Sequence, residues 1–457
     1  MPEVFEQDYT LELLQQVTNA LNSGQFVQVR RTLAEIPPCD TALLLESSPH
    51  KVRTQLWQLV DPDIQGDVLE ELSEDVRLSI IAKMEPELIA AATEDMDDDD
   101  LGEVLRSLPD PVYQDVIGAM DSQDRARATQ ALSYVEHSAG ALMNTDTVTI
   151  RPDVSLDVVL RYLRLKGELP DGTDDLYVVD KDNCFLGALP ISVLLTSQPD
   201  KLVKELMNEE RETIPISMDE SDVAQLFERH NWISAPVVDD NAHLLGRITI
   251  DDIVDVIRED AEHSLMSMAG LDDEEDTFAP VWKSSRRRSI WLGINLLTAL
   301  MAAFVASFFE GTLDILPILA VLNGIVPSMG GVAGSQTLTL VIRGIALGHV
   351  NATNQRFLLG KELAIGALNG LLWSLLIAGV IALWQWDFVL GGVIAFAMFM
   401  NLVAAGIAGA SIPLMLKKMN IDPALAGSVV LTTVTDIVGI FAFWGPQPGC
   451  LFKQPDT

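Results

Sequence analysis

The sequence reads Ser234-Ala235-Pro236-Val237-Val238-Asp239 and, six residues later, Gly246-Arg247-Ile248-Thr249-Ile250-Asp251-Asp252. An apolar run, a polar turn and a second apolar run are typical of two antiparallel strands that lead into a helix. The same pattern occurs earlier, at Val178-Val179-Asp180 and Phe185 to Leu189, and each copy is preceded by a Leu-Met-Asn motif. We therefore predict a β-α-β-β-α unit that is used twice between residues 139 and 262.

This repeat resembles a pair of cystathionine-β-synthase-type (CBS) domains, with one unit over 137–200 and the other over 201–262. The resemblance implies a regulatory module that controls an attached domain. Many CBS pairs bind adenine nucleotides, so the resemblance leaves a nucleotide ligand open for this chain.

Residues 1–136 show apolar residues at helical spacing, interrupted by acidic and proline-containing turns such as Asp61-Pro62 and Glu85-Pro86. This pattern predicts an acidic, all-α N-terminal solenoid of four to six helices. The first 288 residues carry 59 acidic and 24 basic side chains, a net charge of −35. Such a surface repels nucleic acid and anionic lipid, so we expect no nucleic-acid partner and favour cations or basic proteins.

The cysteines are isolated, without a disulfide framework or zinc spacing, and the acidic N-terminus predicts no cleavable signal peptide. No arrangement of residues indicates an enzyme.

Beyond Lys283 the composition changes to apolar stretches of about 20 residues or more, long enough to cross a bilayer. Five all-α transmembrane spans are predicted, at Ser289 to Phe309, Ile315 to Ile345, Leu363 to Leu383, Phe388 to Leu416 and Ala424 to Trp444.

Pro327, Gly330, Gly331 and Gly334 predict a bend or break near the middle of the second span. Basic residues precede the first span and lie in the second and fourth connections, which predicts a cytoplasmic N-terminal half and an outside C-terminus for a multi-pass protein of the cell inner (plasma) membrane. The fold class is thus a multidomain membrane protein, with a solenoid, an α/β CBS pair and an all-α transmembrane domain.

Asp436 lies well inside the last span, within Thr432-Thr433-Val434-Thr435-Asp436. A carboxylate near the bilayer centre costs roughly 2.5 to 3.5 kcal/mol on insertion scales, so such residues usually face an ion path or a cavity. A carboxylate that is bonded to neighbouring hydroxyls, or that lies nearer the membrane surface, is the alternative. The surrounding oxygen atoms suit a hard cation such as Mg2+, which keeps its waters and needs few protein ligands.

Carboxylates also cluster in the acidic half, at Asp97 to Asp100 with Glu103 and at Asp251 to Asp260. Side chains four apart share a helix face, where like charges repel and a divalent ion would neutralise them. A solvated acidic surface is the alternative.

The order of the domains resembles the MgtE family of magnesium channels over nearly the whole chain. The motifs that carry the resemblance are Ala139 to Met143, Pro327 to Gln336, Arg343 to Ala346, Gly360-Lys361-Glu362, Asp422-Pro423-Ala424 and Thr435-Asp436 with Gly439. The resemblance implies a homodimer with Asp436 of both subunits in the pore. It also implies a connecting helix over 263–285 that plugs the pore, a channel domain over 286–450, and Mg2+-sensing carboxylates at Asp99, Glu103, Asp252 and Asp255.

Some positions depart from the family pattern. Ser335 and the Ser428-Val429 pair replace residues that are frequent in the family, which bears on ion selectivity. Asn231, His263 and Ser264 stand where relatives commonly carry acids, so fewer sensing ions are expected.

We therefore expect a Mg2+-selective channel or transporter that admits Mg2+ to the cytoplasm, closes when cytoplasmic Mg2+ binds, and serves magnesium homeostasis. A transporter of Co2+ or Ni2+ as well, and a membrane-anchored nucleotide sensor without transport, are the alternatives. A CBS-linked anion channel fits poorly, because the interiors of the spans lack basic residues.

Overall fold

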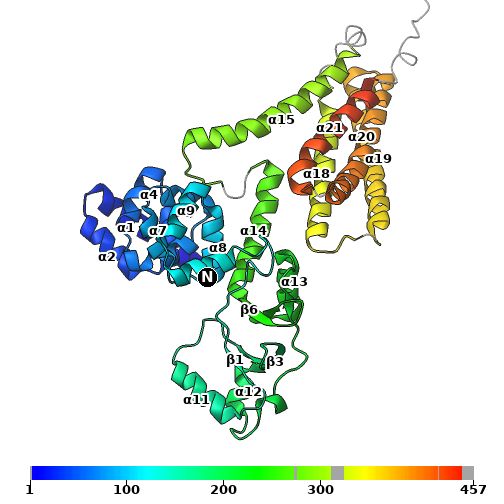
Figure 1. Ribbon diagram of the computed structural model, residues 1–457. Coiled ribbons are helices and arrows are strands. Elements are labelled where there is room, and N and C mark those ends of the chain that lie inside the picture. The colour runs from blue at the N-terminus through cyan, green and yellow to red at the C-terminus, as the bar shows by residue number, and fades with distance from the viewer. Residues whose placement is uncertain (1–2, 272–274, 310–323, 352, 420, 445–457) are drawn as a thin grey trace, which may run out of the picture. The chain divides into compact units, whose positions relative to one another are not determined.

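The computed structural model describes residues 3–271, 275–309, 324–351, 353–419 and 421–444. The chain divides into two compact units. The first consists of Met1–Glu262 with Glu274–Pro280, and the second consists of His263–Asp273 with Val281–Thr457. Figure 1 labels the elements of both units, which are described separately below.

The N-terminal part is a stack of short helices around one apolar core. It contains ten α-helices within the described residues, so the prediction of four to six was wrong. Most of them have only six to ten residues, because a proline or an acidic turn starts a new helix every two or three turns. The elements are α1 (Glu3–Asn22), α2 (Phe26–Glu35), α3 (Pro38–Glu46), α4 (His50–Trp57), the 3-10 helix η1 (Pro62–Ile64), α5 (Gln65–Glu70), α6 (Glu74–Ile81), α7 (Pro86–Ala92), α8 (Asp98–Ser107), α9 (Asp110–Ala119) and α10 (Ser122–Ala131).

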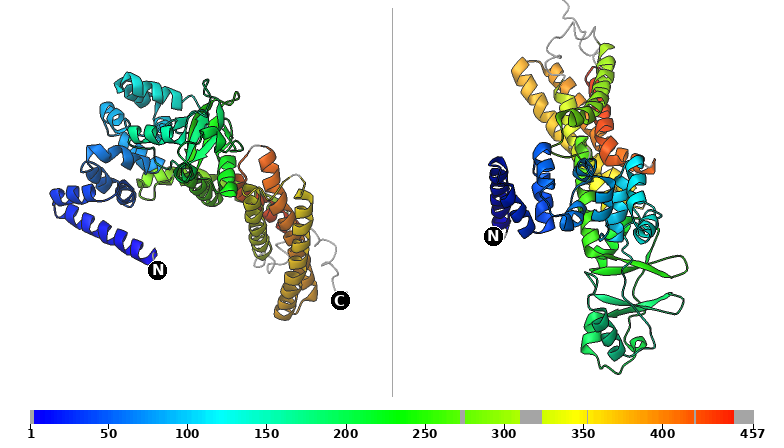
Figure 2. Two further views of the ribbon diagram at one scale, coloured as in Figure 1. Left: turned by 90° about the horizontal axis from the view of Figure 1, so that it is seen from below. Right: turned by 60° about the vertical axis from the view of Figure 1, so that its left-hand side comes forward.

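The repeat folds twice as predicted, into two three-stranded sheets that lie side by side (Figure 2). In each sheet the first two strands are parallel and the last two antiparallel, with a bulge between the paired valines of the second strand. The elements are β1 (Thr149–Ile150), α11 (Leu156–Lys166), β2 (Asp175–Val179), β3 (Phe185–Pro190), α12 (Ile191–Thr196), η2 (Val203–Glu205), β4 (Ile214–Pro215), α13 (Glu220–His230), β5 (Ser234–Val238), β6 (Leu244–Thr249) and α14 (Ile250–Ala269).

Each repeat completes the sheet of the other. Asn208 of the second repeat exchanges backbone hydrogen bonds of 2.8 and 3.1 Å with Ala188 of the first, and Asn144 exchanges bonds of 2.9 Å with Arg247. The crossing chains come so close that a Cβ on Gly246 would lie 2.4 Å from the Asn144 carbonyl oxygen. This contact explains the Leu-Gly dipeptide in both copies of the motif.

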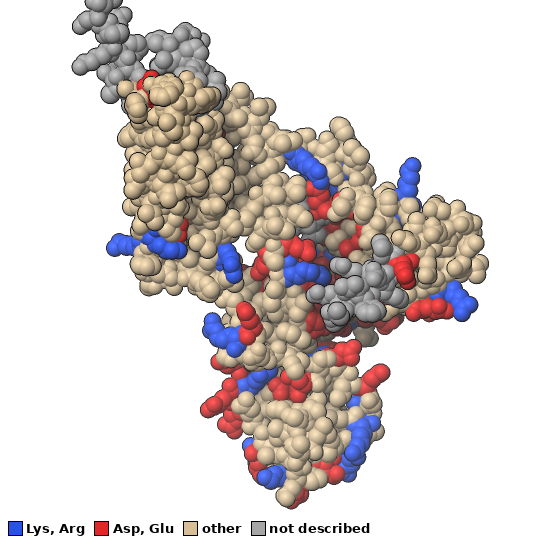
Figure 3. Space-filling model, turned by 180° about the vertical axis from the view of Figure 1, so that it is seen from behind, with Lys and Arg blue, Asp and Glu red and all other residues tan. Residues whose placement is uncertain are grey.

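The membrane part has five helices that are long and apolar enough to cross a bilayer, as predicted. They are α15 (Val281–Ser307), α18 (Ile325–Ala346), α19 (Gln355–Gln385), α20 (Phe388–Lys418) and α21 (Pro423–Trp444). On the face shown in Figure 3, this unit carries few charged side chains. Most of the stretch before α18 lies outside the described residues, and Pro327 is the third residue of α18, where its missing N–H is tolerated.

Helix α20 lies at the centre of this unit, and half of the residues in its most apolar stretch are buried. Its Asn401 is fully buried and donates a 2.7 Å hydrogen bond to the Val326 carbonyl of α18. A Cβ on Gly330 would lie 2.1 Å from the Asn401 amide nitrogen, so α18 can approach α20 only with glycine there. Such close approach at small residues is typical of helix packing in membranes.

The prediction of a single connecting helix over residues 263–285 was wrong. Helix α14 begins at Ile250 and ends at Ala269, and the described residues 275–280 are not helical. Gly270 has a positive φ of 70°, and the Leu271 N–H donates to the Met266 carbonyl, a Schellman-type end to the helix. The domain boundaries at 136, 200, 262 and 285 remain predictions.

We expect Gly246→Ala to destabilise the cytoplasmic unit by about 1 to 3 kcal/mol, because the added methyl group overpacks the crossing of the repeats. Gly118→Ala in α9 is the matched control, since a Cβ there meets nothing within 4 Å. Thermal unfolding of both purified full-length variants checks this. Equal midpoints would show that the crossing relaxes to accept a methyl group.

Candidate metal site and membrane carboxylate

A cavity of about 260 Å³ lies in the first unit, where the start of α8 faces the start of α14. All four predicted sensing residues, Asp99, Glu103, Asp252 and Asp255, line it. Its charge is strongly negative: the lining includes nine acidic residues, two arginines and one histidine. The other acidic residues are Glu74, Asp100, Glu136, Glu220 and Glu259.

Local structure fixes the carboxylates at both sides of this cavity. Asp99 and Asp100 belong to the first turn of α8, where the positive end of the helix dipole stabilises negative charge. Asp252 is the third residue of α14 and accepts hydrogen bonds from the N–H and hydroxyl of Thr249, at 2.9 and 2.8 Å. The bond from the Thr249 N–H is one half of a capping box, and the two bonds together hold the Asp252 side chain in place.

Burial raises the pKa of these carboxyls, and their neighbours raise it further. The pKa of Asp100 is raised to about 8, first by burial and then by Glu70, Glu103 and Asp252. Burial raises the pKa of Asp252 to about 6 although the Thr249 N–H opposes the shift. The pKa of Asp99 is also raised, by burial and then by the Asp252 carboxylate. The cluster therefore resists carrying its full negative charge.

Two of the predicted sensing residues already have basic partners. Arg77, which is almost fully buried, donates to Glu103, and Arg258 lies 3.0 Å from Asp255. In the part of the chain that the structure describes, no Lys or Arg pairs with Asp99, Asp100 or Asp252. We name these three residues the acidic triad.

The acidic triad has the donor chemistry for a hard cation. The Asp99 Oδ1 atom is buried and receives no hydrogen bond. Mg2+ binds oxygen ligands and keeps several waters, so one or two carboxylates can hold it in a cavity of this size. Among the described residues, no three His, Cys, Asp or Glu side chains are already arranged at direct metal-binding distances. The triad thus fits a hydrated divalent ion better than a fully dehydrated one.

Sequence reasoning placed Asp100 in the acidic run but did not select it as a sensing residue. The raised pKa depends on burial and on Glu70, which lies 30 positions earlier on another helix. Asn231, at a position where an acid was expected, ends α13 in the left-handed conformation (φ 52°), which Asn tolerates. His263, another position where relatives commonly carry acids, lies 3.3 Å from Asp422 within the second unit.

Asp436 is half-buried on α21, and no described Lys or Arg forms an ion pair with it. One turn earlier, Thr432 lines a groove with Ser328, Ser335, Gln336 and Thr339 of α18. The groove presents hydroxyl and amide oxygens within membrane helices, as a path for a hydrated cation requires. The predicted pore role of Asp436 remains a prediction.

A second cleft, of about 480 Å³, lies between the two CBS repeats. Arg211, Asp174 and Asp175 supply its charges, and Ile233 and Ala188 supply apolar surface. Arg247 occupies the position in the second repeat that Ala188 holds in the first, and its guanidinium contacts Asp146 and the Asp171 carbonyl.

Comparisons with known proteins agree along the chain. A family model described as "Divalent cation transporter" (MgtE) matches residues 324–445, one described as "MgtE intracellular N domain" matches 36–137, and a CBS-domain model matches 203–259. The chain is 30% identical over 436 residues to the magnesium transporter MgtE of Bacillus subtilis, covering 95% of this chain and 96% of the relative. It is 27% identical to the MgtE of Thermus thermophilus, covering 93% of this chain and 95% of the relative.

A solved structure described as the cytosolic domain of the Mg2+ channel MgtE in complex with ATP matches with 28% identity and a TM-score of 0.50. The match covers 53% of this chain and 99% of that one. The relatives are named as magnesium transporters, a class of proteins that are not enzymes. The chain, a multi-pass membrane protein with a cytoplasmic N-terminal domain, belongs to the MgtE family.

Proposed function

We propose that this protein is a Mg2+ channel that admits the ion to the cytoplasm down its electrochemical gradient. The observation that carries the proposal is Asp436, a membrane carboxylate without a basic partner among the described residues, one helical turn after Thr432, which lines an oxygen-rich groove. A divalent ion gains roughly 4.6 kcal/mol per 100 mV on entering a negative-inside cell, so transport needs no nucleotide. The names of the relatives support Mg2+ as the ion.

Two further proposals concern assembly and orientation. A homodimer would place two Asp436 carboxylates around one ion, and the mass of the purified protein in detergent tests it. An outside C-terminus would expose Cys450 to a membrane-impermeant thiol reagent on intact cells, and a lack of labelling there would contradict that orientation.

We infer that Mg2+ at the acidic triad favours the closed channel. The ion would offset the repulsion between α8 and α14 and hold the helical domain against the CBS pair. The last residues of α14 belong to the membrane unit, where Met268 packs against an apolar cluster that includes Leu338, Ile342 and Leu431. This packing supports a plug role for residues 263–269.

The cleft beside Arg211 is where a nucleotide would bind, because a cation suits phosphate and the carboxylates suit ribose hydroxyls. The ATP complex of the related cytosolic domain supports this second role. Calorimetric titration with ATP tests it.

Selectivity against Co2+ and Ni2+ requires competition flux assays. The alternative of a sensor without transport predicts no flux at all from purified protein in liposomes.

Asp436→Ala should reduce Mg2+ flux in proteoliposomes about tenfold or more, because it removes the charge that attracts the ion. Asp436→Asn should fail similarly. Asp387→Asn is the matched control, since it also removes one carboxylate and Asn still caps α20. Flux near that of the parent in both Asp436 variants would remove this residue from the mechanism.

Asp99→Asn/Asp252→Asn should raise the Mg2+ concentration that half-closes the channel by about tenfold or more. An ion shifts a gating equilibrium only by its better binding to one state, and the variant lacks the carboxylates that provide it. Glu103→Gln/Asp255→Asn is the matched pair, and it should shift the midpoint less because Arg77 and Arg258 already neutralise these residues. Patch recordings across a Mg2+ titration decide, and equal shifts would move the sensing site away from the triad.

Mg2+ binding should release protons at pH 7, and its affinity should rise between pH 6 and 8. With a pKa of about 8, Asp100 is mainly protonated at pH 7, while Mg2+ binds the charged form. Because the folded pKa lies above the ordinary value, stability without Mg2+ should fall as the pH rises from about 4 to 8. Calorimetry in buffers of different ionisation enthalpy measures the protons, with Asp100→Asn as control. Binding without proton release would contradict the assignment.

A further inference from the structure

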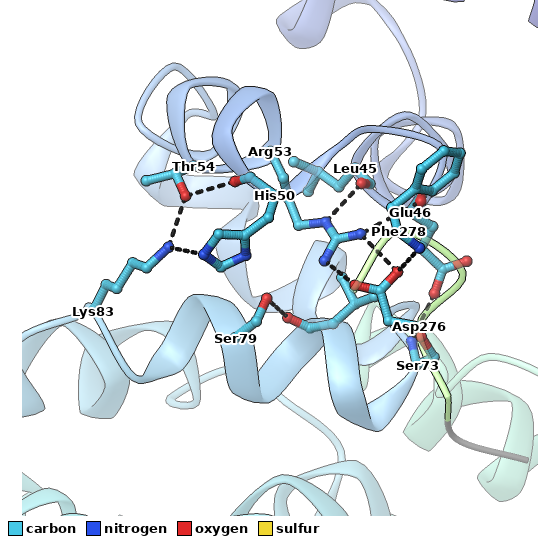
Figure 4. A network of polar contacts seen from close by, with 11 residues as sticks. Leu45, Glu46, His50, Arg53, Thr54, Ser73, Ser79, Lys83, Asp276 and Phe278 are labelled. Atoms are coloured by element: carbon cyan, nitrogen blue, oxygen red, sulfur yellow. Dashed lines mark hydrogen bonds and ion pairs between the residues drawn. The ribbon is translucent and has the colours of Figure 1, made fainter. Parts of the chain in front are cut away.

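The helical domain contains a second charged site, the ion pair of Arg53 with Asp276, and neither residue lines the acidic cavity. The Arg53 side chain of α4 is 1% exposed. Its Nε donates a 2.9 Å hydrogen bond to the Leu45 carbonyl, and its two Nη atoms donate to the carboxylate of Asp276 at 2.7 and 3.1 Å (Figure 4). The pair is bidentate, which is the strongest geometry for an arginine and a carboxylate.

Asp276 belongs to the connector between α14 and α15. Its side chain is 6% exposed, and its Oδ1 also accepts a 2.8 Å hydrogen bond from the Phe278 N–H. The Ala279 N–H donates to the Asp276 carbonyl at 3.0 Å, which closes a turn. The described connector residues 275–280 therefore belong to the first unit, although α15 begins at Val281 in the second.

The helical domain prepares this site without the connector. The Leu45 carbonyl comes from the end of α3, where helix carbonyls attract a cation. Next to it, the Glu46 carboxylate accepts a 2.9 Å hydrogen bond from the Ser73 N–H, which ties α3 to the start of α6 (Figure 4). Without Asp276, the guanidinium would remain buried with an uncompensated charge, a costly state that favours retention of the connector.

We propose that the Arg53 guanidinium, held in place by the Leu45 carbonyl at the end of α3, is a carboxylate-binding site whose occupant is Asp276, and that this contact couples the helical domain to the first membrane helix. Val281 follows Asp276 by only five positions, a tether of at most about 18 Å when fully extended. A movement of the helical domain would then reach α15 through the connector, in addition to the route through α14. The proposal rests on the Mg2+ gating proposed above.

Hydrogen exchange and Mg2+ titration on the full-length protein test the two parts separately. Asp276→Ala should accelerate exchange of the Phe278 and Ala279 amides about tenfold or more, and should raise the Mg2+ midpoint of closure about fivefold or more. Arg53→Met/Asp276→Ala removes the guanidinium as well, so it gives the same two effects without a buried unpaired charge. Glu35→Gln is the control, because it breaks an exposed ion pair in the same domain.

Unchanged exchange in both Asp276 variants would overturn the attachment. Faster exchange with an unchanged Mg2+ midpoint would overturn the coupling, while the acidic triad could still gate the channel. A parent channel that Mg2+ does not close would overturn the proposed gating and the coupling with it, and the exchange result would still decide the attachment.

Discussion

Repulsion among partly buried carboxylates is the constraint on which the cytoplasmic half depends. In the acidic triad, carboxylates from the first turn of α8 face one from the first turn of α14, and Arg77 and Arg258 pair instead with Glu103 and Asp255. Protons or a divalent ion can relieve this repulsion. The raised pKa values of Asp99 and Asp100 show that these carboxyls favour the protonated form. Competition between protons and the ion links the contact of two domains to the ionic composition around the protein.

The membrane half depends on the opposite kind of chemistry. Helices α18, α19 and α20 approach one another through glycine, and the buried polar groups, such as Asn401, bond to backbone carbonyls. Glu362, which is 3% exposed, instead accepts a hydrogen bond from the side-chain hydroxyl of Thr337. Asp436 differs from both because it is only half-buried and lies one helical turn after Thr432, which lines a polar groove.

The sequence predicted features whose signals are local or repeated. The CBS pair followed from two copies of one motif, and the five membrane helices followed from long apolar stretches. The number of N-terminal helices was missed because short helices of six to ten residues carry little periodic signal. The end of α14 was missed for another reason: the connecting helix over 263–285 was inferred from the family resemblance, and the local signal of Gly270 was not used.

Contacts between distant residues could not be predicted from one sequence. Arg77 neutralises a predicted sensing residue 26 positions away, and Arg53 binds a carboxylate 223 positions away. Spacing along the chain contains no information on such pairs. The same limit applies to Asp100, whose pKa reflects how deeply the fold buries it.

The crossing of the two CBS repeats has a consequence for folding. Asn144 and Asn208 each bond to a strand of the other repeat, so neither repeat alone satisfies the backbone groups that the crossing pairs. A division of the chain near residue 200 separates two copies of a motif, but it cuts through one cooperative unit. A fragment ending there would leave Ala188 with an unpaired strand edge, which other chains could bind in place of Asn208.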